Sequence, residues 1–227
     1  TPGQNNDGSS SALHHYLIEL PTSPQSVCAN PTITVSACAD AGCTSLYTDA
    51  VSGSLYQDKL ASSSTVLSFV NGVASLTVEE TNLQTVTYSL SGASPTADNT
   101  LVCTGGAGNC QVVFDGSTSY RWTDKVDESC EQTDVTLAAF VYNTSLAQCN
   151  EVSGSTNTNI SFQYLSPSSN TASTPLTVSN GVNTQQINAG GSVQIAVNLG
   201  AANNLSLTYA DAGSLSVSAS DPSSMIA

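Results

Sequence analysis

The stretch TVLSFVNGVASLTV, residues 65–78, decides the fold class of this chain. Apolar side chains recur at every second position on both sides of the pair Asn71-Gly72. These side chains are Leu67 and Phe69 before the pair, and Ala74, Leu76 and Val78 after it. A period of two is typical of a strand with one buried face, and Asn-Gly between two such runs is the strongest short-range signal of a β-hairpin. The stretch therefore predicts two antiparallel strands joined by a tight turn.

The same period of two recurs along the chain. No stretch of about ten residues or more shows the apolar periodicity of a helix. The strands expected from it lie at 14–20, 32–38, 86–90, 111–114, 133–142, 160–164, 193–199, 205–209 and 215–219, with a second hairpin at Asn180-Gly181. Strands at this spacing predict an all-β fold of two tandem immunoglobulin-like β-sandwich domains. We place these domains at residues 12–118 and 119–227, after a flexible leader or linker at 1–11.

Charge excludes several classes of partner. The 227 residues include 17 acidic and only 3 basic side chains, for a net charge of −14. So few cations neutralise few phosphates, which excludes nucleic-acid binding and argues against docking on anionic lipid. No apolar run is long enough to insert directly into a membrane. The polar N-terminus has no apolar core, so we expect any signal peptide to have been removed.

Seven cysteines in an acidic chain indicate an oxidising, extracellular or cell-surface setting. Two pairs are separated by short glycine-containing loops, and a third pair flanks the strand expected at 133–142. The disulfides expected on this basis are Cys38–Cys43, Cys103–Cys110 and Cys130–Cys149. Cys28 is then left over. We expect an unpaired buried thiol there, a swapped bridge from Cys28 to Cys103 or Cys110, or an intermolecular disulfide.

Three segments together carry a resemblance to a known family. They are HHYLIEL and VCANPTITVSACADAGCTSLYT within 14–48, LVCTGGAGNCQVVF at 101–114, and LTYADAGSLSVSAS at 207–220. The chain resembles the first part of the C-terminal domain of MshQ-like proteins, bacterial surface proteins associated with mannose-sensitive haemagglutinin pilus loci. One departure is the sequence at 114–117, FDGS, where the family usually has Ala-Asp-Ala-Gly. The resemblance implies a cell-surface, pilus-linked setting. As partners we expect copies of this chain or other surface or pilus proteins.

Catalysis has few candidate residues. A nucleophilic triad needs a histidine base, and His14 and His15 are the two histidines. The candidates for glycoside hydrolysis are the adjacent carboxylates Glu79 and Glu80, and the group Asp124, Asp127 and Glu128. Neighbouring residues on a strand point to opposite faces, however, and a charged loop is commoner than a catalytic pair. We therefore predict that the chain is not an enzyme.

Two binding sites are considered instead. Five carboxylates close together would supply the hard oxygen ligands that Ca²⁺ prefers, and we expect no cofactor other than calcium. These candidate ligands are Asp124, Asp127, Glu128, Glu131 and Asp134, and the alternative is a solvated acidic linker. Tyr120 and Trp122 could stack on a sugar ring, and the alternative is that they pack a joint between the domains.

The strand at 14–20 offers a further hypothesis. An exposed sheet edge accepts a strand from a neighbouring molecule, and the apolar face of such a donor would be Tyr16, Ile18 and Leu20. The alternative is that this strand is the first strand of its own domain.

Together these observations predict a non-catalytic, extracellular structural module at the bacterial cell surface. We expect it to serve as a filament- or pilus-associated subunit or as an adhesin stalk. The alternative is a carbohydrate-binding adhesin module.

Overall fold

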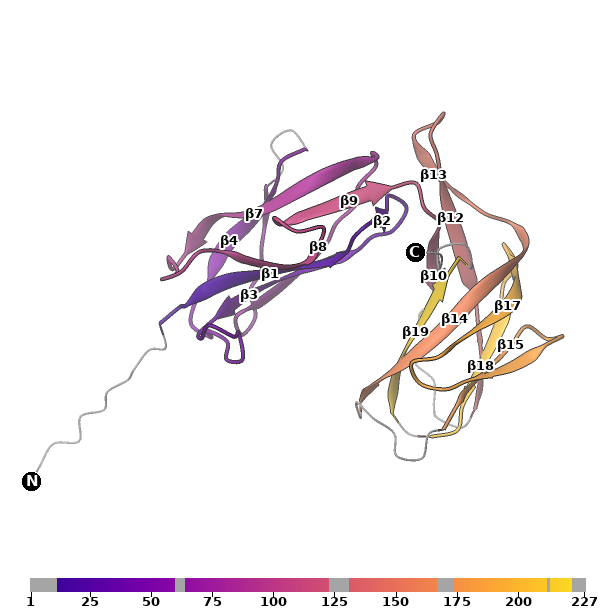
Figure 1. Cartoon of the computed structure of the whole chain (residues 1–227). Coiled ribbons are helices and arrows are strands. Elements are labelled where there is room, and N and C mark those ends of the chain that lie inside the picture. Colours follow the sequence, from indigo (N-terminus) through magenta and orange to yellow (C-terminus); the bar gives the residue numbers. More distant parts are fainter. Residues whose placement is uncertain (1–11, 60–63, 123–130, 167–173, 212, 222–227) are drawn as a thin grey trace, which may run out of the picture. The chain divides into compact units, whose positions relative to one another are not determined.

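The computed structural model describes residues 12–59, 64–122, 131–166, 174–211 and 213–221 (Figure 1). These residues form strands and turns and contain no helix, hence none that could cross a membrane. The chain divides into two compact units, Thr1–Asp115 and Gly116–Ala227, compared with a predicted boundary at 118. The predicted leader at 1–11 lies outside the described residues. The all-β, immunoglobulin-like prediction is confirmed.

The first sheet of the first unit is built around its N-terminal strand. Strand β1 (His15–Thr22) pairs antiparallel with β3 (Thr32–Cys38) and parallel with β8 (Val102–Gly106). On its other side β3 pairs with β6 (Val73–Thr77), so the order is β6-β3-β1-β8. Strand β1 is therefore a central strand with partners on both edges.

A second sheet completes the first sandwich. Its strands, in spatial order, are β2 (Gln25–Ser26), β9 (Gln111–Asp115), β7 (Gln84–Ser94), β4 (Ser52–Gln57) and β5 (Ser64–Val66). The two sheets meet where buried Tyr16 and Ala37 pack with Leu90 and Ala93 of β7. Burial of apolar side chains between the sheets is the main force that holds such a sandwich together.

The turn that the opening stretch predicts is present. Asn71 and Gly72 both have positive φ, 50° and 81°, as a type I′ turn requires. Val70 and Val73 exchange backbone hydrogen bonds across the turn, at 2.8 and 3.1 Å. The stretch before the turn is not one continuous strand: Thr65 and Val66 belong to β5, which pairs with β4, and Val70 forms only a single bridge to Val73.

The second unit contains three sheets around one core. The first sheet is β10 (Ser119–Trp122), β12 (Leu137–Asn143) and β13 (Gln148–Glu151). The second is β11 (Gln132–Val135), β18 (Leu205–Tyr209), β15 (Leu176–Ser179) and β16 (Thr184–Ile187). The third is β17 (Ser192–Leu199), β14 (Gly154–Ser166) and β19 (Ser214–Ser220). All three contribute to the core, as shown by the buried residues Leu137, Leu176 and Phe162.

The strand predicted at 133–142 is two strands in the structure. Strand β11 ends at Val135 and β12 begins at Leu137, and the two belong to different sheets. Val135, Leu137 and Ala139 are all buried, so the period of two continues without a break across the change of sheet. The hydroxyl of Thr136, at the junction, accepts a hydrogen bond from the Asn203 amide at 2.9 Å.

Candidate functional site

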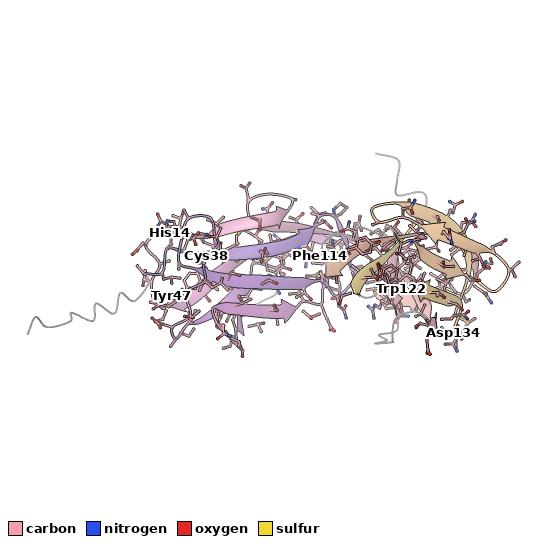
Figure 2. All side chains as sticks on the ribbon, turned by 90° about the horizontal axis from the view of Figure 1, so that it is seen from below. His14, Cys38, Tyr47, Phe114, Trp122 and Asp134 are labelled. Carbon is pink, nitrogen blue, oxygen red and sulfur yellow. A yellow bond between two sulfur atoms is a disulfide. The ribbon has the colours of Figure 1, made fainter. Side chains whose placement is uncertain are left out.

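Two disulfides fasten turns of the first unit. Cys38 bonds Cys43 with a Cα–Cα distance of 4.8 Å, and Cys103 bonds Cys110 with a Cα–Cα distance of 5.4 Å. Both pairs are confirmed as predicted. Figure 2 shows Cys38 at the same end of the first unit as His14 and Tyr47. Each bridge reduces the conformations available to its loop in the unfolded chain, which stabilises the folded turn.

The Cys38–Cys43 loop closes around the carboxylate of Asp40. One oxygen accepts hydrogen bonds from the backbone amides of Gly42 and Thr44, at 2.9 and 3.1 Å. The other accepts from the Thr44 hydroxyl at 2.9 Å and from the Ser45 amide at 2.6 Å. These donors, the Thr44 amide first, lower the pKa of Asp40 to about 2, since each stabilises the charged form. The short, polar spacing between the cysteines thus places a charged side chain where it satisfies the amides of its own loop.

The Cys103–Cys110 loop rests against β1 through two glycines. Gly105 and Gly106 have positive φ, 72° and 63°. A Cβ atom on Gly105 would clash with the carbonyl oxygen of Leu20, and one on Gly106 with that of Gln111. Glycine is therefore required twice over, for the backbone angle and for the close approach.

Of the remaining cysteines, Cys28 and Cys149 lie in the described part of the chain. Cys28, which is 1% exposed, is disulfide-bonded. The expectation of an unpaired thiol there is therefore wrong. Cys149 in β13 is also disulfide-bonded. Its predicted partner, Cys130, lies outside the described residues.

The two histidines contact each other at the end of the first unit that carries the Cys38–Cys43 bridge. Their Nδ1 atoms are 2.9 Å apart, and His15 is buried, with 3% exposure. His15 also lies within 4.8 Å of the sulfur atoms of Cys38 and Cys43. Those sulfurs are bonded to each other, so they are not thiolates available for a metal ion.

The adjacent glutamates have opposite environments. Glu79 is exposed, whereas Glu80 is buried and accepts hydrogen bonds from the amides of Thr81 and Asn82, at 2.8 and 2.9 Å. Burial is the main cause that raises the pKa of Tyr88, and the nearby charges of Glu80 and Asp58 raise it further. The two glutamate side chains therefore do not converge on a common substrate position.

Comparison with known families adds to this geometry. Residues 99–226, more than half of the chain, match the family described as domain of unknown function (DUF6701), first Ig-like domain. The chain belongs to this family. Residues 13–96 are similar to a second family, described as domain of unknown function (DUF8613). No curated protein matches the chain.

The family boundary does not coincide with the boundary of the folded units. The match to the DUF6701 family begins at residue 99, yet β8 and β9 belong to the sheets of the first unit. Strand β8 pairs with β1, and β9 pairs with β7 and β2. The Cys103–Cys110 bridge thus lies within the family match but stabilises the preceding sandwich.

The aromatic residues considered for sugar stacking pack inward. Tyr120 and Trp122 lie on β10, and both are half-buried against the core of the second unit. Burial raises the pKa of Tyr120, whose hydroxyl is near that of Thr158. Between them, the guanidinium of Arg121 lies 4.5 Å from the centre of the Phe140 ring. This geometry favours a packing role over an exposed platform for a sugar.

The candidate calcium ligands are described only in part. Asp124, Asp127 and Glu128 lie outside the described residues, and Glu131 is exposed. Asp134, labelled in Figure 2, accepts a hydrogen bond from the Ser206 hydroxyl at 2.6 Å. This contact joins β11 to β18, so Asp134 has a role in sheet pairing.

The proposed donor strand is part of its own sheet. Tyr16, Ile18 and Leu20 are 5%, 0% and 8% exposed, and β1 is paired on both edges. The Tyr16 hydroxyl also donates to the Pro95 carbonyl oxygen at 2.9 Å. Because its apolar face fills its own sandwich, β1 is not available to a neighbouring molecule. The alternative, that it is the first strand of its own domain, fits the structure.

A polar hollow in the second unit was not anticipated from the sequence. It has a volume of about 460 Å³. Its asparagines are Asn180, Asn183, Asn198, Asn203 and Asn204. They come from the β15–β16 turn, from β17 and from the turn before β18. Asn180-Gly181 was the available signal, but it indicated a hairpin and did not show which distant residues would meet it.

Proposed function

We propose that the chain is a non-catalytic structural module at the bacterial cell surface, as a filament- or pilus-associated subunit or an adhesin stalk. The observation that carries the proposal is the pair of disulfide-closed turns in the first unit. Such turns resist local opening, and disulfides form and persist in oxidising compartments. Membership of a family of Ig-like domains agrees with this role, although a fold by itself does not determine a function.

The surroundings of His15 and Glu80, the candidate catalytic residues, support a role without catalysis. A general base must reach the proton that it removes. His15 is buried against a disulfide, and Glu80 is bound by the amides that follow it in the chain. The resemblance to MshQ-like proteins, on the segments at 14–48, 101–114 and 207–220, supports the pilus-linked setting.

Labelling of intact cells tests this proposal. Antibodies against the chain are expected to label unpermeabilised cells of the bacterium that makes it, while antibodies against a cytoplasmic protein do not. Purified material is expected to show repeating assemblies in negative-stain images. Peptide mapping without reductant should recover the linked pairs Cys38–Cys43 and Cys103–Cys110. Labelling only after permeabilisation, with all seven cysteines open to alkylation, would contradict the proposal.

A further inference from the structure

Hydrogen bonds between distant segments hold the walls of the asparagine-lined hollow in the second unit. The Asn180 amide nitrogen donates to the Ala196 carbonyl at 2.8 Å, and its oxygen accepts from the amides of Val182 and Asn183, at 2.9 and 2.7 Å. These bonds hold the β15–β16 turn against β17. A surface whose shape is fixed in advance binds a ligand at a lower entropic cost.

The opposite wall is held in a similar way. Asn204 accepts from the Leu137 amide at 2.8 Å and donates to the Leu137 carbonyl at 2.8 Å and the Asn198 carbonyl at 3.2 Å. Asn203 has a φ of 51°, and its backbone amide donates to Thr136. The turn before β18 is thereby fixed against β12 and β17.

Three other side-chain amides in the hollow remain unused. Those of Asn183, Asn198 and Asn203 make no hydrogen bond within the described part of the chain, and all three residues are exposed. Each amide offers two donors and one acceptor. Ser155, opposite Asn198 in the pairing of β14 with β17, adds a hydroxyl. Donors and acceptors from four different segments thus line the same hollow.

The hollow is uncharged although the chain is strongly acidic. None of the described residues that line it is ionisable, whereas the whole chain carries a net charge of −14. A cationic ligand would find no carboxylate there, and an anionic one would meet the repulsion of the acidic chain. Ala196, Ala201 and Ala202 also line the hollow, and their methyl groups can contact C–H groups of a ligand.

We propose that this hollow binds a neutral saccharide through the amides of Asn183, Asn198 and Asn203. Saccharide hydroxyls pair with amide donors and acceptors, and the alanine methyls contact the carbon face of the ring. The volume lies within the usual range of small-molecule sites, about 300–1,000 Å³. No aromatic ring lines the hollow, so binding is weak, in the millimolar range. This saccharide site does not depend on the proposed structural role. A stalk would be located at the cell surface whether or not the hollow binds a sugar.

Nuclear magnetic resonance titration of the full chain tests the site. The probes are glucose, galactose, mannose, N-acetylglucosamine and their neutral disaccharides, with glucuronate and glucosamine as charged counterparts. At least one neutral sugar is expected to shift amide signals confined to residues 180–183 and 196–204. The double variant Asn183→Ala/Asn203→Ala is expected to weaken binding at least about tenfold, the loss of roughly 1.4 kcal/mol.

Asn157→Ala is the matched control, because Asn157 is an exposed asparagine on β14 outside the hollow. It is expected to leave the titration unchanged, and the spectra of both variants report directly whether they are folded. Two results would overturn the proposal: no local shifts with any neutral sugar at tens of millimolar, or equal binding by the charged sugars.

Discussion

Gly105 shows how strongly a single position constrains the first unit. It combines a positive φ of 72° with contact against the Leu20 carbonyl, whereas Gly108, in the same disulfide loop, has a φ of 90° and open space around it. The comparison separates the cost of backbone angle from the cost of close approach.

We predict that Gly105→Ala destabilises the chain more than Gly108→Ala does. The backbone angle costs about 1–2 kcal/mol at either position, and overpacking adds about 1–3 kcal/mol at Gly105 alone. Midpoints of denaturant unfolding measure the difference. Equal losses in the two variants would show that β8 can move away from β1.

Asp40 makes the loop around it sensitive to acid. Its folded pKa of about 2 lies below the usual value of 3.8, so the charged form is favoured by folding. The contribution of Asp40 to loop stability is therefore complete above pH of about 4 and is lost as the pH falls through about 2.

Amide signals of Gly42, Thr44 and Ser45 are expected to titrate together with a midpoint near pH 2, as measured by nuclear magnetic resonance. Asp40→Asn, which keeps the shape but removes the charge, is expected to abolish this titration. A midpoint at the ordinary aspartate value would mean that the loop amides do not hold the carboxylate.

The strands show where a sequence pattern and the final pairing differ. The alternation of Val135, Leu137 and Ala139 correctly indicates buried positions but conceals the change of sheet at Thr136. The pattern at 14–20 likewise identifies a strand without showing that β8, more than eighty residues later, is its parallel partner.

Strands β8 and β9 are predicted to be essential to the first unit, even though the family match assigns them to the following segment. A chain ending at residue 98 would leave one edge of β1 and one of β7 unpaired and would remove buried Val112 and Phe114. Residues 12–115 are expected to give a dispersed nuclear magnetic resonance spectrum and a cooperative melt, and residues 12–98 neither. A cooperative melt of the shorter chain would show that the DUF8613 match, 13–96, folds alone.

For the whole molecule, the chain combines two all-β units with an unusually low content of basic residues. Its net charge of −14 makes copies of the chain repel one another, and its disulfides stabilise turns of the first unit. These properties suit a protein that must persist outside the cell, which is the setting proposed above.

The sequence by itself determined the all-β class, the two-part organisation, the tight turn at Asn71-Gly72 and the two short-loop disulfides. Each of these depends on residues close together in the chain, where period, turn chemistry and spacing act directly. The tertiary structure alone decided the central position of β1, the inward packing of Tyr120 and Trp122, and the meeting of distant asparagines in one hollow. Those features depend on which strands pair across long separations, and many pairings bury the same alternating residues equally well.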